Sequence, residues 1–454
     1  MNQSWKKIIQ FSLPMTFIGL ADIILIYMSL FWAGIFINDV EALAAIRVSG
    51  SVVMIIEVVL LAVAGALLIF ISQSVGAKNL KQAKKGITQA NTLTLFAGIG
   101  ITVLGFLLYP YLIRIFDVTA STAGYMEDYL LVFFLGYIPV ALNNLLLALP
   151  RYFQNLKLVY RGLAVLLISN AISTPSFMYL FDQLGLSLIG GAALGVICAN
   201  LICSVFMMFK LFVKDALEVG LSGKSLLPVM DFQIVREQKM FIFSQVANNI
   251  TFNLSSFLYI IILSYYPADV LNVYTIGVYM FAALGLFFQN FIGSIIPIVA
   301  QYKGANEIEN INDIVWQMFK IVAISGGGIA LAFILFRNQI ASWISVSEEL
   351  TSTYAEFLLI YSIPWLFNLL SMIFVLTISG SGDAKGGLYL IISNMYVLSI
   401  VPLLIIPRLF DDVIQGVFIT LAIINLFTFV NSLGYYLLGK WRKASLIQPE
   451  AVGS

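Results

Sequence analysis

Long apolar runs separated by short polar segments repeat along the whole chain of 454 residues. Most runs reach about 20 residues, the length that an α-helix needs to cross the bilayer core. The pattern predicts an all-α integral membrane protein with twelve transmembrane helices. The predicted spans lie near residues 11–36, 46–72, 87–113, 129–150, 158–181, 187–213, 240–266, 271–300, 315–336, 355–379, 387–407 and 413–438.

Composition agrees with this interpretation, because 61% of the residues are hydrophobic and only 10% are charged, against about 25% charged residues in soluble domains. Basic residues indicate the orientation, since cytoplasmic loops retain most Lys and Arg. With the N-terminus inside, the outer side keeps only four of the 24 basic residues, namely Arg47, Arg114, Arg337 and Arg408. The sequence therefore predicts a multi-pass protein of a prokaryotic-type plasma (inner) membrane, with both termini cytoplasmic.

An internal repeat predicts two homologous halves. Three sets of residues recur: Gln73, Gly76 and Ala77 return 228 positions later, Tyr129, Ile138, Pro139 and Asn143 return 225 positions later, and Ile168, Ser169 and Asn170 return 224 positions later. Six spans per half is an even number, so both halves enter the membrane from the same side. We expect two six-helix lobes related by a pseudo-two-fold axis along the membrane normal. The lobes would be residues 1–213 and 239–454, joined by a cytoplasmic linker over residues 214–238 that has room for an interfacial helix.

Six prolines lie inside the predicted spans. Each removes a backbone N–H donor and so favours a bend. They are Pro14, Pro139, Pro175, Pro297, Pro364 and Pro402. Such bends can be hinges in a moving transporter, but proline is also common in membrane helices for packing reasons.

Two of the 23 acidic residues, Asp22 and Glu57, fall well inside predicted spans. Each is about eleven residues from one end of its span, or roughly 16 Å deep in a core of about 30 Å. Intramembrane carboxylates are costly and usually functional, although a helix-packing role is the alternative. Two carboxylates in a low-dielectric site hold a proton or a cation between them. We therefore predict that Asp22 and Glu57 couple transport to Na⁺ or H⁺, while leaving open whether they face each other.

Several polar side chains are candidates for lining a substrate cavity. Ser29 lies seven positions after Asp22 on the same helical face. Gln245, Asn249 and Asn253 form an amide stripe at i, i+4 and i+8 in the seventh predicted span, and Asn170 recurs in the repeat. Amides in a membrane helix need partners or water, and interhelical hydrogen bonding is the alternative interpretation.

Motifs of catalysis and nucleotide binding are missing from the sequence. It contains no GxxxxGK[ST] loop, no nucleophile elbow, no HExxH or CxxC motif and no histidine. The sequence therefore offers no residues for ATP hydrolysis, for enzyme activity or for a histidine-ligated metal. We expect no cofactor beyond the coupling ion. The expected partners of this monomer are the lipid bilayer and a small-molecule substrate, and not nucleic acid.

Short motifs are spread over both halves of the chain: SLP at 12–14, Gly34 with ALAA at 42–45, ISQSVGAKNLKQAKK at 71–85, GAALGV at 191–196, QYKGA at 301–305 and SGSGDAKGG at 379–387. In the order and placement of these motifs, the chain resembles the multidrug and toxic compound extrusion (MATE) transporters. The resemblance implies a two-lobed exporter with a central cleft, driven by inward Na⁺ or H⁺ flow and expelling cationic, amphipathic compounds.

Two positions depart from the family pattern. Many members carry an Asp five residues before the glycine matched to Gly34, where this chain has Ser29, and Asp22 lies two turns nearer the cytoplasm. An acid that some members carry in span seven is replaced by the amide stripe. Asp22 and Glu57 are therefore chosen on burial and not copied from the family.

Two other functions compete with multidrug export. Export of one dedicated metabolite fits the same residues. A flippase for lipid-linked oligosaccharides would favour cationic side chains in the cleft to bind a diphosphate, and the sequence has none at mid-membrane.

Overall fold

The computed structural model describes residues 3–37, 39–116, 118–345 and 348–447, and these are almost entirely helical. The side chains of a few helical residues, Asp22 and Asn253 among them, lie outside the described set. The helices are α1 Gln3–Phe36, α2 Val40–Gly76, α3 Leu80–Ile115, α4 Ala120–Leu135, α5 Tyr137–Tyr152, α6 Leu156–Gln183, α7 Leu188–Met208, η1 Phe209–Val213, η2 Gly223–Leu226, α8 Phe232–Leu263, α9 Ala268–Gly293, α10 Ile295–Gly304, α11 Ile308–Leu335, α12 Arg337–Ile344, α13 Glu348–Ser381, α14 Ala384–Ile392, η3 Ser393–Ile400, α15 Val401–Ile405, η4 Ile406–Leu409, α16 Val413–Leu437 and η5 Lys440–Lys443.

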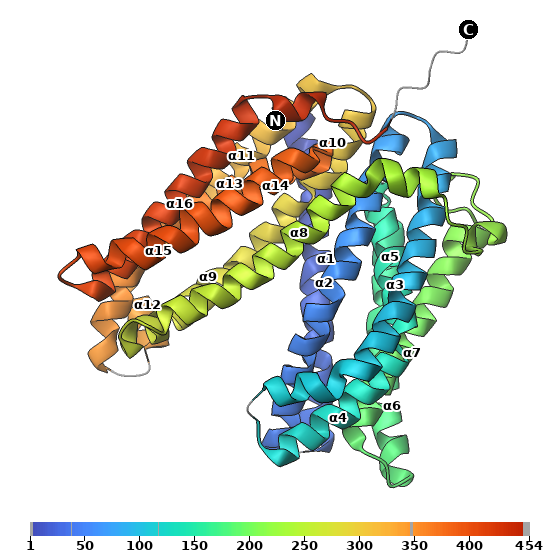
Figure 1. Cartoon of the computed structure of the whole chain (residues 1–454), viewed down its shortest axis with the longest axis horizontal. Helices are drawn as coiled ribbons and strands as arrows, with labels where there is room; N and C mark the ends of the chain where they lie inside the picture. Colours follow the sequence, from blue (N-terminus) through green and yellow to red (C-terminus); the bar gives the residue numbers. More distant parts are fainter. Residues whose placement is uncertain (1–2, 38, 117, 346–347, 448–454) are drawn as a thin grey trace. The chain divides into compact units, whose positions relative to one another are not determined.

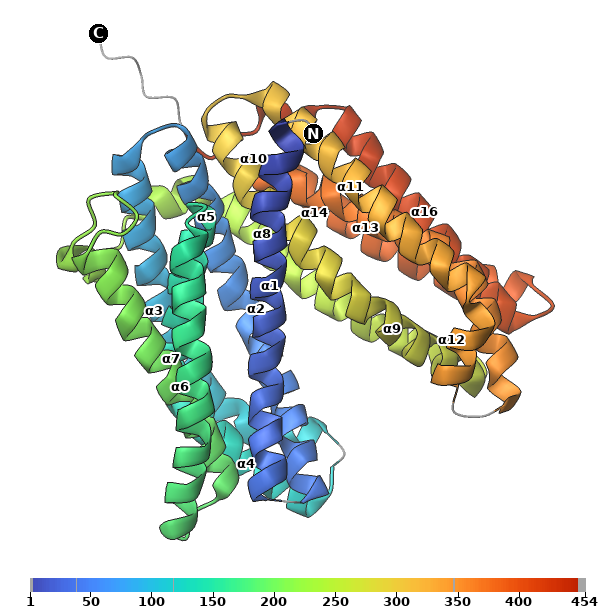
Figure 2. The same ribbon diagram turned by 180° about the vertical axis from the view of Figure 1, so that it is seen from behind.

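The chain forms two compact units, which we call the N-unit and the C-unit (Figures 1 and 2). The N-unit is Phe17–Ile242, and the C-unit combines Met1–Thr16 with Phe243–Ser454. Both boundaries fall inside helices, so α1 and α8 each run without a break from one unit into the other. Within the C-unit, α13 is central and packs against α9, α10, α11, α12 and α16.

Nine of the twelve predicted spans, or ten if one bent pair of helices counts as a span, are confirmed as helices long and apolar enough to cross a membrane. In the described part of the chain nine single helices qualify, and α4 with α5 makes a tenth if they form one bent span. These ten are the third to the twelfth predicted spans. The first two spans lie in α1 and α2, which contain residues outside the described set, so they stay predictions.

Three of the six prolines coincide with helix breaks. Pro139 and Pro297 are each the third residue of their helix, α5 and α10, so neither can donate to the carbonyl four residues earlier, across the break. Pro402 is the second residue of α15, the helix that follows the π-helical segment η3. By contrast, α1, α6 and α13 continue through Pro14, Pro175 and Pro364.

The internal repeat reappears as a repeated backbone turn. After α2 and after α10, a non-glycine residue takes a left-handed conformation, with φ of 57° at Lys78 and 60° at Asn306. The next residue donates its N–H to the carbonyl five positions back, at 2.9 Å in both turns. This is the Schellman pattern that ends helices. The two positions are 228 apart in the sequence, the spacing of the first repeated motif.

Polar loops meet at one end of the N-unit. The Lys84 ammonium, near the start of α3, donates to the carbonyl of Gly220 in the linker. Asn155, which caps α6, donates to the linker carbonyl of Ala216 at 3.3 Å. The α2–α3 loop, the α5–α6 loop and the linker therefore share one end, as the distribution of basic residues requires.

The linker is a folded, largely irregular segment and not a long helix. Its only helical turn before α8 is η2, and α8 begins at Phe232. The Asp215 carboxylate accepts from the backbone N–H groups of Val219, Gly220 and Leu221 at 3.1, 2.7 and 3.1 Å. Leu226 at the end of η2, and Val229 and Asp231 after it, are hydrogen-bonded to three buried polar side chains of α3, namely Asn91, Thr92 and Gln89.

Close packing of α6 on α7 depends on glycine. A Cβ at Gly195 would lie 2.4 Å from the Cα of Thr174, a backbone atom that has no freedom to move aside. We expect Gly195→Ala to lower the free energy of unfolding by about 1–3 kcal/mol through overpacking. Thermal unfolding in detergent measures this change. The matched control is Gly100→Ala in α3, where a Cβ meets no atom within 4 Å; equal stability losses in the two variants would contradict the packing argument.

Candidate functional site

Glu57 lies on the face of α2 that packs into the N-unit. One turn before it on the same face, Val53 belongs to the buried apolar cluster of this unit and is 8% exposed. Ile46 and Val52 of the same helix belong to that cluster too. Helices α4 and α5 pack against α2, so the Glu57 carboxyl points among apolar side chains of two neighbouring helices.

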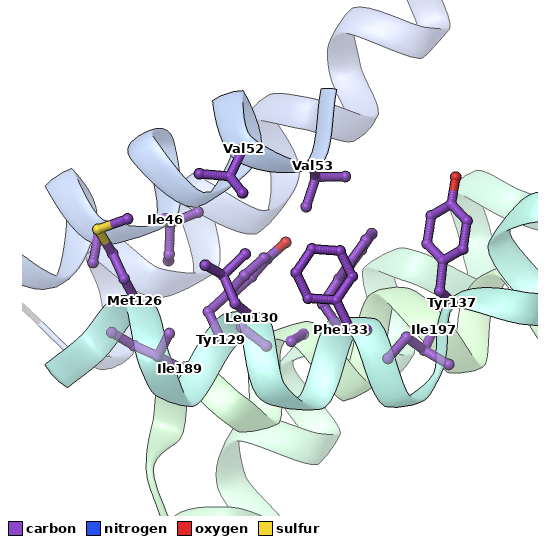
Figure 3. Packing of buried hydrophobic residues seen from close by; sticks show 14 of the residues in the cluster. Ile46, Val52, Val53, Met126, Tyr129, Leu130, Phe133, Tyr137, Ile189 and Ile197 are labelled. Atoms are coloured by element: carbon purple, nitrogen blue, oxygen red, sulfur yellow. The ribbon is translucent and has the colours of Figure 1, made fainter. Parts of the chain in front are cut away.

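An aromatic ladder on α4 and α5 forms the opposite wall. Tyr129, Phe133 and Tyr137 are spaced at i, i+4 and i+8, with ring centroids 5.8 Å apart for the first pair and 5.9 Å for the second. All three side chains are at least 93% buried. Figure 3 shows the rings of Tyr129 and Tyr137 projecting from α4 and α5 to the side on which Val52 and Val53 of α2 lie. The first and last residues of the ladder, Tyr129 and Tyr137, each carry a phenol hydroxyl, and the surface around them is otherwise apolar.

Gly136 sets the direction of Tyr137. Helices α4 and α5 meet at this residue with a bend of 63°, and Tyr137 is the first residue of α5. Ile197 fills the space where a side chain at position 136 would be, since a Cβ there would lie 2.5 Å from its Cδ1 atom. The bend, the small residue and Pro139 three positions later together turn the Tyr137 ring towards α2.

The Glu57 carboxyl and the Tyr137 hydroxyl face each other. Each group acts electrostatically on the other, and the charge of Glu57 also acts on Tyr129. The Tyr137 oxygen is fully buried and makes no conventional hydrogen bond, so the two groups are close but not at ideal geometry. Within the described residues, no cationic side chain acts on Glu57 and no three His, Cys, Asp or Glu side chains gather as a metal site. The arrangement is therefore a half-buried glutamate beside two phenols.

Two of the predicted site residues, Asp22 and Asn253, have side chains outside the described set, although α1 and α8 run through them. Whether Asp22 reaches Glu57 stays a prediction. Ser29 is described, and its side chain is 7% exposed, within α1 of the N-unit.

The remaining cavity candidates lie in different units. Asn170 is 2% exposed in the N-unit, where its side-chain oxygen Oδ1 accepts a hydrogen bond from the Thr174 hydroxyl at 3.3 Å. In the C-unit, the Gln245 amide donates to the Ser379 hydroxyl of α13 at 2.9 Å. Asn249 donates back to the carbonyl of Gln245, also at 2.9 Å. The structure thus joins α8 to α13 through the amide stripe, while lining of a cavity by these residues stays a prediction.

The Gln245–Ser379 bond can be tested by a double-mutant cycle. We expect Gln245→Leu and Ser379→Ala each to reduce thermal stability, and the double variant to lose less than their sum, with a coupling energy of about 0.6 kcal/mol. Detergent-solubilised protein suffices for the measurement. Strictly additive losses would mean that the bond contributes nothing, which would leave the amide free to serve a cavity.

The phenol partners of Glu57 were not among the site residues predicted from the sequence. Tyr129 was noticed only as part of the repeat, and Tyr137 was not selected. A usable signal was present, because two tyrosines eight residues apart flank a glycine inside an apolar run. In the C-unit, the helix that follows α8 carries no such acid; α9 instead places Phe281 among Phe357, Tyr361 and Trp365.

Comparison with known proteins agrees with this architecture. The MatE family model matches residues 14–180 and 246–405, well over half of the chain. A probable multidrug resistance protein, YpnP of Bacillus subtilis (strain 168), is 25% identical over 204 residues, and the aligned part spans only 45% of that relative's length and 45% of this chain. Among solved structures, the Vibrio cholerae MATE transporter VcmN in its bent form superposes with a TM-score of 0.84 at 18% identity over 96% of both chains. A MATE in the bent conformation gives a TM-score of 0.85 at 16% identity over 98% of both chains. Family match and fold agree, and the chain belongs to the MATE family of membrane transporters.

Proposed function

We propose that this protein is a secondary active exporter, in which inward movement of Na⁺ or H⁺ drives the efflux of amphipathic, cationic small molecules. Family membership supports export, and the relative named as a probable multidrug resistance protein supports a broad substrate class. The observation that carries the coupling is Glu57, a carboxyl group deep in the N-unit that faces two phenols. A buried acid of this kind serves ion coupling better than it serves packing.

The proposed orientation places the basic loops of both units in the cytoplasm of a prokaryotic-type cell, with both termini inside and the protein acting as a monomer. Support comes from the N-unit, where the α2–α3 loop, the α5–α6 loop and the linker share one end. In the C-unit, Lys303 at the end of α10 likewise donates to the carbonyl of Arg442 in the C-terminal segment η5.

Alternating access requires the two units to move, and only α1 and α8 carry the chain between them. Pro14 lies just before the boundary in α1, where it leaves the carbonyl of Gln10 without a helical donor. Beside it, the Ser12 hydroxyl bonds that of Ser294 at 2.5 Å and holds the start of α1 to the C-unit. We propose that α1 bends after this anchor when the units move.

Dye accumulation in inside-out membrane vesicles tests the function. Ethidium, an amphipathic cation, should accumulate when the vesicle interior is loaded with Na⁺ or made acidic, with one of the two gradients sufficient. Vesicles that lack the protein are the control. If neither gradient drives accumulation of ethidium or of a panel of uncharged and peptide-like probes, ion-coupled multidrug export is the wrong function.

A further inference from the structure

We propose that residues 439–443, which follow the last membrane helix, bind the phosphate headgroup of an anionic phospholipid in the cytoplasmic leaflet. We call this segment the basic turn, because Lys440, Arg442 and Lys443 give it three positive charges. The choice of leaflet follows from the orientation proposed above. Lipid binding itself is independent of the export function.

The basic turn is a fixed structure and not a loose tail. Gly439 takes a left-handed conformation, with φ of 69°, and ends α16. Trp441 is completely buried; its ring stacks on that of Tyr436 with centroids 5.3 Å apart, and its indole N–H donates to the Tyr436 carbonyl at 2.9 Å. From α10, the Lys303 ammonium donates to the carbonyl of Arg442. The turn is therefore folded back onto the end of α16 and held from two sides.

The three basic side chains are exposed and not neutralised by the protein. In the described part of the chain, no hydrogen bond or ion pair joins Lys440, Arg442 or Lys443 to a carboxylate. The guanidinium carbon of Arg442 lies 5.7 Å from the centroid of the Trp441 ring, and stacking of this kind leaves the N–H edge free to bind an anion. The next acid along the chain, Glu450, lies outside the described residues.

The length of α16 places the basic turn at the level of the lipid headgroups. The helix has 25 residues, about 38 Å at the usual rise, against about 30 Å for the hydrocarbon core. Leu437 and Leu438 at its end are 61% and 68% exposed, and Val430 further back is 55% exposed. Apolar side chains exposed on a membrane helix are covered by acyl chains. A phospholipid that covers these residues would bring its phosphate to the basic turn.

The fold does not require basic residues at this place. At the repeat spacing of 225 positions, Lys440 and Lys443 correspond to Asp215 and Glu218, which follow η1 in the N-unit. Corresponding helix ends in the two units thus carry opposite charges. Basic residues also fix the orientation of a span, but orientation needs no buried tryptophan and no lysine bond to hold the charges in place. Charges held in a fixed arrangement favour binding, because less freedom is lost when the ligand arrives.

Native mass spectrometry tests the proposal, because it counts single lipids bound to the protein and needs no substrate. Purified protein in neutral detergent is titrated with phosphatidylglycerol or with phosphatidylcholine of the same acyl chains. We expect the first phosphatidylglycerol to bind the wild type about ten to a hundred times more tightly than phosphatidylcholine, at roughly a fivefold gain per basic side chain. In the triple variant Lys440→Gln, Arg442→Gln, Lys443→Gln this preference should disappear.

Three further arms separate the parts of the proposal. The matched control is Lys224→Gln, Arg236→Gln, Lys239→Gln, which removes the same charge from exposed positions of the linker and α8 and should keep the preference. Trp441→Leu keeps all three charges but loosens the turn, and it should lose part of the preference. Inorganic phosphate in large excess should leave the lipid bound, because it has no acyl chains to cover the end of α16.

Each part of the proposal can fail. An unchanged preference in the triple variant, or an equal loss in the control, would overturn the basic turn as the lipid site. Displacement by inorganic phosphate would make the ligand a soluble anion, and full preference in Trp441→Leu would overturn the need for a fixed turn. These results leave the ethidium test of export untouched, and a protein that accumulates no ethidium can still show the lipid preference.

Discussion

Glu57→Gln should reduce gradient-driven ethidium transport to the level of passive leak. Glutamine keeps the shape of the side chain, but it has no charge to lose or gain, and so the transport cycle loses its link to the ion gradient. The variant should fold normally, since an amide is easier to bury than a carboxyl group that ionises. Initial rates of ethidium accumulation in inside-out vesicles, with thermal stability followed in parallel, measure both effects.

Glu127→Gln is the matched control for this result, because it makes the same substitution at an exposed position of the N-unit. It should transport like the wild type. Normal gradient-driven transport in a folded Glu57→Gln variant would mean that Glu57 is a packing residue.

Asp22→Asn decides whether the two acids act together. If they share one site, this variant should lose coupling as Glu57→Gln does, because either substitution removes one member of the acid pair. If Asp22→Asn alone abolishes coupling, the carried ion belongs to Asp22 and the role of Glu57 is structural. Loss of coupling in Glu57→Gln alone would place the carried ion on Glu57, with Asp22 a packing residue of α1.

The sequence predicted the features that depend on local pattern. Apolar length alone located nine spans, or ten if α4 and α5 form one bent span. The repeat predicted two homologous halves, and its first motif coincides with matching turns at Lys78 and Asn306 that the sequence analysis did not predict. Pro139 predicted a bend near the junction of α4 and α5, because the loss of a backbone N–H donor can be read from the residue type alone. What the break accomplishes, the turning of Tyr137 towards α2, depends on Ile197 of a helix far along the chain.

The site escaped the sequence analysis for a related reason. Glu57 was selected because burial of a charge can be read from a single span, but its phenol partners lie about 70 to 80 residues away on helices whose rotation the apolar pattern leaves open. The polar stripe in α3 is a second case. Gln89, Asn91 and Thr92 were not singled out in the sequence, and their hydrogen bonds to the linker are visible only in the folded chain.

The strap formed by residues 226–231 should come loose in the double variant Gln89→Leu, Thr92→Val. The side-chain oxygen of Gln89 accepts from the backbone N–H of Asp231 at 2.7 Å, and the Thr92 hydroxyl accepts from the backbone N–H of Val229 at 3.0 Å. Each bond is worth about 0.5–1.5 kcal/mol, so losing both should weaken the docking of the strap by roughly 2 kcal/mol. Because Asp231 also accepts from the first backbone N–H groups of α8, the start of that helix should fray with it.

Limited proteolysis reads out this opening. Lys224 is an exposed trypsin site in the linker, and cleavage of a transiently opened segment follows the population of the open form. At about 1.4 kcal/mol per tenfold change, we expect cleavage at Lys224 to become ten times faster or more in the double variant. Thr88→Val is the matched control, since the Thr88 hydroxyl donates only to the carbonyl of Lys84 within α3, and its cleavage rate should equal that of the wild type. Equal rates in all three proteins would show that the strap is held by its apolar contacts, and that the buried polar stripe of α3 serves another purpose.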